Sequence, residues 1–257
     1  MKELKYPYFK KDRILKIEML ENMRDFPRDM LDIYCFGLTD GIVCGFEPEV
    51  DKNKITFSEG ITKFKGKVYL IGESVTLDYG ETDSDVMIKL CFGEKIRDKD
   101  YETTPIDFII DRDMKVSDNQ QELGRFKLKK GAYLRSDYQD LYDFTTEYNT
   151  FNVVNVKYAG IEEPAINIDM LRYFAKEALN AVPKDIYDVS FCMQCLNSTR
   201  VEKSVIYSYL NYKLNENISY MSNKDIHNNL VNILDDIKRE SSRKIRNRPF
   251  SDKIIVE

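Results

Sequence analysis

The first forty residues carry apolar side chains at helical spacing. The apolar positions recur every three or four residues, at Ile14, Leu15, Met19, Leu20 and Met23. Pro27 favours the start of a second short helix, and Gly37 favours its end. We therefore expect a helical lead-in over residues 1–40.

From Asp40 onward the apolar period falls to two, which is the spacing of half-buried strands. Short alternating runs occur at Ile55–Phe57, Val75–Tyr79, Val86–Phe92, Ile106–Ile110 and Phe126–Leu128. Turn residues separate the runs about every ten positions. This pattern predicts an antiparallel β-sandwich or barrel over residues 41–160, with one face packed inward and the other facing solvent or a partner.

Local turn signals refine this expectation. Lys65–Gly66 favours a tight hairpin between two strands, and residues 151–156 (FNVVNV) have the composition of a last strand. A bridge rich in Tyr, Asp and Asn precedes that segment. We expect the bridge to hold one helical turn or an ordered loop.

After Glu163–Pro164 the apolar spacing becomes helical again. Four predicted stripes are Ile168, Leu171, Phe174, Ala175 and Leu179; Ile186, Val189, Met193 and Leu196; Val201, Val205, Tyr209 and Leu210; and Ile226, Leu230, Ile233 and Ile237. Asn167 or Asp169 can cap the first helix, and Ser222-x-x-Asp225 resembles a capping box for the last. We expect residues 161–257 to form a helical bundle with a short β-prone tail, which makes the fold class α+β.

The composition is that of an ordinary globular protein, with 42% apolar and 32% charged residues. A net charge of −5 suggests neither a nucleic-acid coat nor a membrane-surface protein. The polar start of the chain does not resemble a signal peptide, and no apolar run approaches the ~20 residues of a membrane span. The five cysteines are then most simply reduced cytosolic thiols. The 17 tyrosines suit protein interfaces, although a low-GC coding bias explains them equally well.

Few residues carry a pattern of catalysis or metal binding. Cys192 and Cys195 form the only CxxC pair; without a second pair we expect buried thiols rather than a zinc or redox site. His227 is expected to be a partly exposed structural residue. The Asp111-x-Asp113 step fails the EF-hand pattern, and no phosphate-binding glycine loop is present. We expect no enzyme activity, no cofactor and no metal site.

The basic stretch from Lys238 to Lys253 allows three interpretations. It can be a helix end that complements the helix dipole, a tail that docks on an acidic neighbour, or a set of phosphate contacts to nucleic acid. Arg243, Arg246 and Arg248 are the candidate contact residues. The final KIIVE has the composition of a strand that adds to this protein's own sheet or to a neighbour's.

Two longer segments resemble a known family. The segment from Tyr6 to Ile71 contains DGIVCGFE followed by ITFSEGITKFKGKVYLI, a turn-and-strand order shared with baseplate and tail-fibre-associated proteins. These proteins belong to contractile-tail prophages and phage-tail-like bacteriocin particles of Gram-positive bacteria. Residues 122–160 are similar to prophage tail-region proteins. The likeness covers most of residues 6–180. Phe46 replaces the common Leu, and Glu59 stands where Pro is frequent.

The resemblance implies a structural part of a tail tip, with no active-site residues to carry over. We therefore expect a non-enzymatic baseplate component that docks neighbouring baseplate or tail-fibre proteins in a symmetric assembly, first in the cytoplasm and then within a tail-like particle. Residues 1–160 would dock on the baseplate or a fibre, and residues 161–257 would hold neighbouring copies. The candidate interface anchors are Tyr138, Tyr142, Tyr148 and Tyr158. The alternative is a nucleic-acid-associated protein that uses the basic segment.

Overall fold

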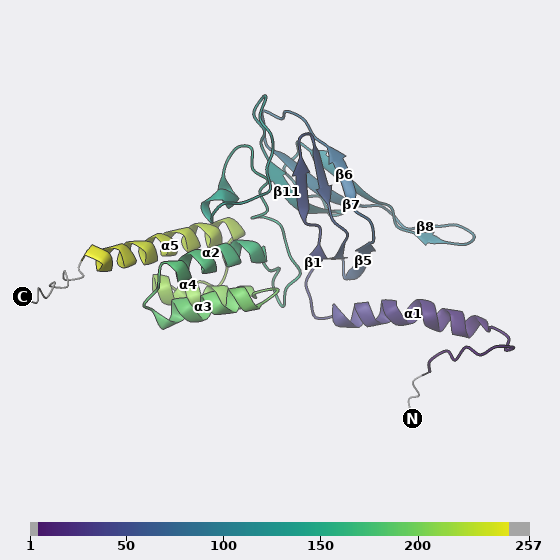
Figure 1. The fold of residues 1–257 in the computed structure, drawn as a ribbon. Helices are drawn as coiled ribbons and strands as arrows, with labels where there is room; N and C mark the ends of the chain where they lie inside the picture. The colour runs from purple at the N-terminus through teal and green to yellow at the C-terminus, as the bar shows by residue number, and fades with distance from the viewer. Residues whose placement is uncertain (1–4, 247–257) are drawn as a thin grey trace, which may run out of the picture.

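The computed structural model describes residues 5–246, with side chains for residues 5–242. One helix precedes a region of antiparallel strands, and four further helices follow (Figure 1). The mixed helix and sheet content agrees with the predicted class. The division at residues 40 and 160 stays a prediction, because the buried side chains of the strands and the later helices belong to one hydrophobic cluster.

The lead-in differs from the sequence prediction. A single helix, α1, runs from Ile17 to Tyr34 and includes Pro27, where two helices were expected. Proline lacks an N–H, so it removes one hydrogen bond of the helix, but its fixed φ is compatible with helical backbone. The helix continues through the proline to Tyr34, and Cys35, not Gly37, follows its last turn as the C-cap.

The strands form three small antiparallel sheets and one two-stranded ribbon. The first sheet is β1 (Gly41–Gly45), β4 (Gly60–Phe64) and β5 (Lys67–Ile71), with β4 in the centre. The others are β2 (Pro48–Asp51), β3 (Lys54–Phe57) and β6 (Val75–Asp78); β10 (Ile106–Asp111), β7 (Val86–Phe92) and β11 (Gln120–Phe126); and the ribbon of β8 (Ile96–Arg97) with β9 (Glu102–Thr103). Within the described residues the strands do not close into a barrel, so the layered alternative fits better.

Strand β7 lies at the centre of the core. Its side chains are almost all buried, and its neighbours pair with Met87–Phe92 and with Val86–Cys91. Lys89 is the polar exception; its Nζ donates to Asp111 Oδ2 at 2.8 Å and to the Lys115 carbonyl at 2.7 Å. Aromatic contacts join the layers, since Phe57 packs against Phe108 and Phe151 with ring centroids 5.9 and 6.0 Å apart.

The predicted hairpin turn is confirmed. Lys65 and Gly66 join β4 to β5 with φ angles of 48° and 73°, as a two-residue hairpin turn requires. The Asp40 carboxylate accepts hydrogen bonds from both turn amides, at 2.7 and 3.1 Å. This side chain fixes the turn from 25 residues away.

The predicted last strand at residues 151–156 is wrong. This segment makes only an isolated bridge, between Asn152 and Arg125, and then turns. The Asn152 side chain accepts from the Val154 amide at 2.9 Å, and the Val156 amide donates to the Val153 carbonyl. These local bonds compete with strand pairing. The helical turn expected before it is present as a 3-10 helix at Tyr142–Thr145.

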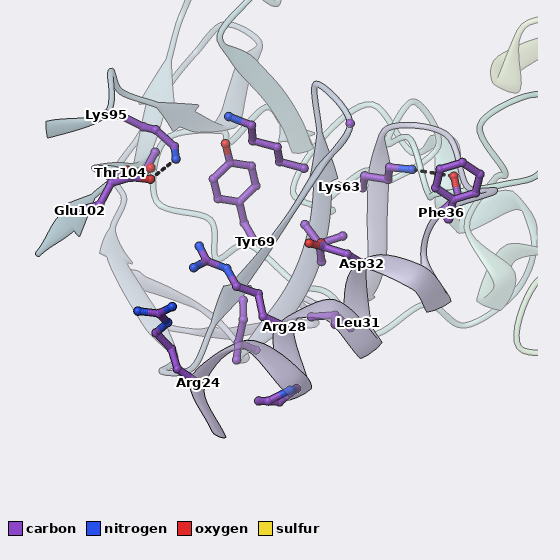
Figure 2. Close-up of a pocket in the computed structure, with 15 residues that line it drawn as sticks. Arg24, Arg28, Leu31, Asp32, Phe36, Lys63, Tyr69, Lys95, Glu102 and Thr104 are labelled. Carbon is purple, nitrogen blue, oxygen red and sulfur yellow. Dashed lines mark hydrogen bonds and ion pairs between the residues drawn. The ribbon is translucent and has the colours of Figure 1, made fainter. Parts of the chain in front are cut away.

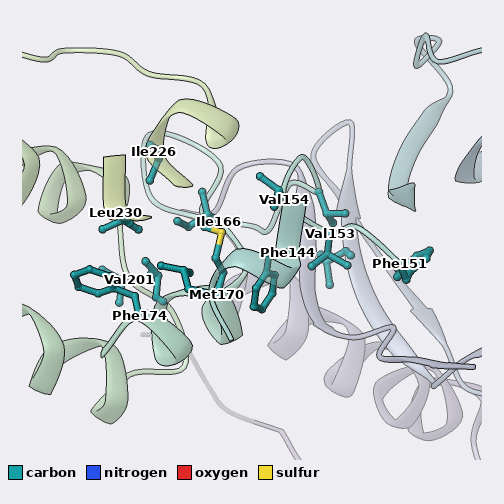
Figure 3. Packing of buried hydrophobic residues seen from close by; sticks show 14 of the residues in the cluster. Phe144, Phe151, Val153, Val154, Ile166, Met170, Phe174, Val201, Ile226 and Leu230 are labelled. Carbon is teal, nitrogen blue, oxygen red and sulfur yellow. The ribbon is translucent and has the colours of Figure 1, made fainter. Parts of the chain in front are cut away.

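The four later helices are α2 (Ile168–Asn180), α3 (Ile186–Asn197), α4 (Lys203–Leu214) and α5 (Asn223–Arg246). Asn167 caps α2, and Ser222 exchanges bonds with Asp225 at the start of α5, as predicted. Figure 3 shows Phe144, Ile166 and Met170 packed where the loops from the sheets meet α2. No helix in the described range is both long and apolar enough to span a membrane.

The predicted stripe of α3 is wrong. Ile186, Met193 and Leu196 are exposed, and the helix instead buries Asp188 and Phe191 together with the two cysteines. Asp188 is held inside by Tyr209, whose hydroxyl donates to it at 2.7 Å, and by the ammonium of a lysine on α4. A buried carboxylate is tolerated only with such partners, and no periodicity predicts them.

Candidate protein-interaction surface

The most unusual surface belongs to α1. None of its side chains is buried, although its sequence is strongly amphipathic. A single helix face carries apolar residues at alternating spacings of four and three: Met19, Met23, Phe26, Met30 and Ile33. We call these five residues the apolar seam of α1. This spacing is that of a helix packed along a second helix.

Four of the five seam residues are exposed, whereas Met19 is half-buried and the Tyr6 ring packs edge-on against Phe26 with centroids 5.6 Å apart. Met30 is 63% exposed and Ile33 is 76% exposed, and Met23 and Phe26 are also exposed. Further exposed apolar side chains precede the helix and occur at its C-terminal end: Tyr6, Tyr8, Phe9, Ile14 and Leu15 before it, and Tyr34 and Phe36 at the end. In the described part of the chain, 13 of the 27 exposed large apolar side chains fall within residues 6–36. The concentration exceeds what single scattered side chains would give.

One flank of α1 is acidic. At 100° per residue its five carboxylates all lie on one side of the seam, whereas Arg24 and Arg28 lie outside this flank. Packing two antiparallel copies of this helix seam to seam would bring the two acidic flanks together. A partner helix with basic flanks would instead meet opposite charge.

A buried lysine attaches α1 to the sheets. Lys63, on β4, is 7% exposed, and its Nζ donates to the carbonyls of Cys35, Phe36 and Leu38 at 2.9, 3.3 and 2.7 Å. Helix C-termini leave carbonyl groups without helical partners and attract positive charge. The Lys63 ammonium therefore fixes the exit of α1 and leaves the seam facing away from the core.

Two of the predicted tyrosine anchors are engaged within the chain. The Tyr138 ring stacks on Phe144 with centroids 3.9 Å apart, and its hydroxyl donates to the Phe151 carbonyl at 2.6 Å. Tyr158 is half-buried, and its hydroxyl accepts from Asn167 at 2.8 Å. Burial raises the pKa of both phenols above the ordinary value. These contacts account for both residues without a partner, and an interface role for them stays a prediction.

The other two tyrosines lie nearer the surface. Tyr142 is exposed; its hydroxyl donates to Asp235 at 2.5 Å, and burial together with this carboxylate raises its pKa to about 12. Tyr148 is half-buried beneath the ammonium groups of Lys127 and Lys129, 4.4 and 4.1 Å from its ring centroid. The structure does not gather the four tyrosines into one patch with α1, and their contact with a partner also stays a prediction.

The basic candidates cannot be placed in a site. The side chains of Arg243 and Arg246 and all of Arg248 lie outside the described residues, as does the KIIVE segment. Lys238, at the near end of the basic stretch, pairs with Glu177 at 2.7 Å. The nucleic-acid alternative depends on this segment and gains no support from the described part of the chain.

The candidate chemical groups are internal. Cys192 and Cys195 are fully buried as predicted, and burial raises the pKa of each thiol to about 12. His227 was expected to be partly exposed, but it is buried: its ring contributes to the packing of α5 and its Nε2 lies 2.9 Å from the Leu141 carbonyl. Burial lowers its pKa. No group of three or more potential metal ligands occurs within the residues described.

Sequence reasoning found α1 but did not identify its face as a surface. The signal was available, since the apolar seam extends over two heptads at the four-three spacing of a helix that packs along a second helix. The exposed α3 residues were assigned to the interior because apolar periodicity alone does not say which face a helix buries.

No protein-family model matches the chain, and no curated protein matches it. Three solved structures are similar in shape. A chain of the type VI secretion system TssK–TssF–TssG baseplate subcomplex, determined by cryo-electron microscopy, aligns with a TM-score of 0.40 and 8% identity over 93% of this chain and 100% of that chain. The crystal structure of TssK aligns with a TM-score of 0.40 and 6% identity, over 93% of this chain and 72% of that chain. A chain of the baseplate complex from the type VI secretion system aligns with a TM-score of 0.36 and 10% identity, over 92% of this chain and 100% of that chain. Likeness this low carries no weight in the function proposed below.

Proposed function

We propose that this chain is a non-enzymatic structural component of a phage-tail-like baseplate and that it docks neighbouring baseplate or tail-fibre proteins. The family resemblance of residues 6–180 supports the assignment to a tail-like particle. The exposed apolar seam of α1 is the observation that supports docking most directly. In this proposal the chain acts by presenting shaped surface, and no bond is made or broken on it.

The size of the apolar surface supports a stable interface. If each of the 13 exposed apolar side chains within residues 6–36 contributes about 100 Å², the total is on the order of 1,000 Å². Monomers rarely expose more than a few hundred Å² of contiguous apolar surface. A standard interface buries about 800 Å² on each partner. A partner that covered these side chains together would bury an area of standard size.

The occupant that fits the seam is an amphipathic helix of a different particle protein. The four-three spacing of the apolar residues suits helix-against-helix packing. The acidic flank of α1 disfavours an antiparallel second copy of the same helix and favours a partner with a basic flank. This assigns residues 1–40, together with the sheets that hold them, to docking on the baseplate or a fibre.

A pair of substitutions in the seam tests the proposal. Met23→Asp with Met30→Asp places two charges where the partner helix would pack, while both side chains are exposed in the isolated chain. The matched control is Lys130→Asp with Lys184→Asp, which adds acidic side chains at two exposed positions outside α1. We expect both purified variants to unfold within about 1 kcal/mol of the unaltered chain. Tail-like particles from the source bacterium should contain the control variant at normal amounts and lose the seam variant at least about tenfold.

Incorporation of the seam variant at the normal amount would contradict the proposal. Particles that lack even the unaltered chain would contradict the assignment to a tail-like assembly altogether.

A further inference from the structure

A groove lies on a different side of α1 from the apolar seam. It has a volume of about 750 Å³ and runs between α1, strand β5 and the β8–β9 ribbon. Arg24, Pro27, Arg28 and Leu31 of α1 form one wall, and residues 66–70 form the other. Figure 2 shows Arg28 pointing from the helix toward Tyr69 on the opposite wall.

The β5 wall of the groove is an unpaired sheet edge. β5 pairs with β4 only, and the described residues contain no strand on its other side. The two-residue turn makes Phe64 and Lys67 a hydrogen-bonded pair, so alternate residues of β5 point their backbone groups outward. The outward residues are Val68 and Leu70, whose N–H and C=O groups bond to no other backbone group in the described part of the chain.

This edge carries one protecting charge, Lys67, but is otherwise open. Natural proteins cover or charge an exposed edge because it is a template for pairing with another chain. Here the outward residue Leu70 is apolar and 67% exposed, and it lies beside the groove. The helix on the far side leaves room along the strand instead of covering it. A helix and a free strand edge on either side of a groove are the arrangement in which an extended peptide adds a strand.

The groove is positively charged within an acidic chain. Five lysine and arginine side chains line it against two carboxylates, whereas the whole chain has a net charge of −5. Arg24 pairs with Asp25, and Lys95 pairs with Glu102. Arg28 and Lys67 make no ion pair within residues 5–242. Two cations therefore remain available beside the strand edge.

We propose that this groove binds an extended acidic segment of a partner protein, which pairs with β5 as an added strand. The outward N–H and C=O groups of Val68 and Leu70 would bond to the backbone of the segment, and Arg28 and Lys67 would meet its carboxylates. The alternation of donor and acceptor along the edge fits a peptide better than a phosphate chain, which offers acceptors only. This site uses another side of α1 and does not depend on the docking of the apolar seam.

Binding of a defined peptide to the isolated full chain tests the proposal. The probe is a fluorescein-labelled nine-residue peptide with glutamate at odd positions and valine at even positions. Two matched competitors are the same peptide with lysine for glutamate and the same peptide methylated at every backbone nitrogen. We expect the acidic probe to bind, and neither competitor to displace it, because one has the wrong charge and the other cannot donate to a strand.

Four variants separate the contributions. Leu70→Pro removes the outward N–H and should weaken binding at least about tenfold, whereas Leu70→Thr keeps the amide and should stay within about twofold. Arg28→Glu with Lys67→Glu should also lose at least about tenfold. Lys184→Glu, an exposed lysine away from the groove, is the charge control. In the unaltered protein, hydrogen exchange at the Val68 and Leu70 amides should slow when the probe is added. This measurement tests the site even if a variant fails to fold.

Three results would overturn the proposal. One is a probe that fails to bind at millimolar concentration or that leaves exchange at the β5 edge unchanged. Another is equal displacement by the methylated peptide, which would show that charge alone holds the probe. The third is another occupant: a ten-nucleotide oligothymidylate that binds through the same cations would assign the groove to nucleic acid, and a dimer lost on Leu70→Pro would assign it to a second copy.

Discussion

Replacing Lys63 with methionine should loosen α1 from the sheets. Lys63 is nearly buried, and its ammonium donates to three carbonyls at the end of α1. Methionine keeps most of the aliphatic length but leaves these carbonyls without their donor. The two shorter bonds, at 2.9 and 2.7 Å, dominate the effect. With about 1.5 kcal/mol for each bond to a charged group, the loss in unfolding free energy is about 3 kcal/mol.

Part of this loss is offset, because a buried ammonium also costs solvation energy that methionine does not. We therefore expect a decrease of about 2–3 kcal/mol in urea unfolding, with an unchanged m-value. Hydrogen exchange should report a larger effect in α1 than in the central strand β7, because Lys63 supports the helix exit rather than the core. The control is Lys65→Met, at an exposed position of the hairpin turn two residues after Lys63. It should change the free energy of unfolding by less than about 0.5 kcal/mol.

A decrease below about 0.5 kcal/mol for Lys63→Met would refute this reasoning. It would mean that water satisfies the three carbonyls as well as the ammonium does. An equal loss of exchange protection throughout the sheets would also contradict it, because Lys63 would then support the core as a whole.

Three further predictions concern single residues. His227 is the only histidine, and burial lowers its pKa in the folded state. As the pH drops below about 6.5 the unfolded chain therefore binds this proton before the folded chain does, and the free energy of unfolding should fall. Between pH 7.5 and 5.5, urea unfolding should show a smaller decrease in His227→Gln than in the unaltered chain, and an equal decrease in both proteins would count against this. At Gly124 a Cβ would lie 2.1 Å from the Phe151 ring, so Gly124→Ala should destabilise by about 1–3 kcal/mol in thermal unfolding, and an unchanged melting temperature would show that the ring moves freely. Cys44 is exposed, whereas Cys192 and Cys195 are buried and burial raises the pKa of both thiols. A thiol reagent should therefore modify Cys44 in the native protein and reach the CxxC pair only on unfolding. Fast labelling of Cys192 in the native protein would contradict this packing.

Local patterns predicted much of the secondary structure. The period-two runs located β3, β6, β7 and β10, and the Lys65–Gly66 turn was found because its backbone angles suit few other residues. The stripe of α5 was correct in all four positions, from Ile226 to Ile237. In these elements propensity, periodicity and turn chemistry agree, so the sequence alone is informative.

The misses arose where distant residues decide the outcome. The burial of Asp188 in α3 depends on a tyrosine and a lysine of another helix, so the buried face did not follow from apolar spacing. Asn152 turned a β-prone segment away from the sheet through a side-chain hydrogen bond.

The candidate surfaces were even less accessible to sequence reasoning. Aromatic composition pointed to Tyr138 and Tyr158, but both hydroxyls bond within the chain. The free edge of β5 depends on strand order, which no local pattern contains. The open seam of α1 depends on where Lys63 holds the helix.

Hydrogen exchange of this chain inside purified tail-like particles, compared with the isolated chain, tests the central claim most directly. The proposed docking predicts that α1 amides exchange markedly faster in the isolated chain than in the particle, while the amides of β7 are equally protected in both. Equal exchange of α1 in the two states, or particles that contain none of this chain, would contradict it.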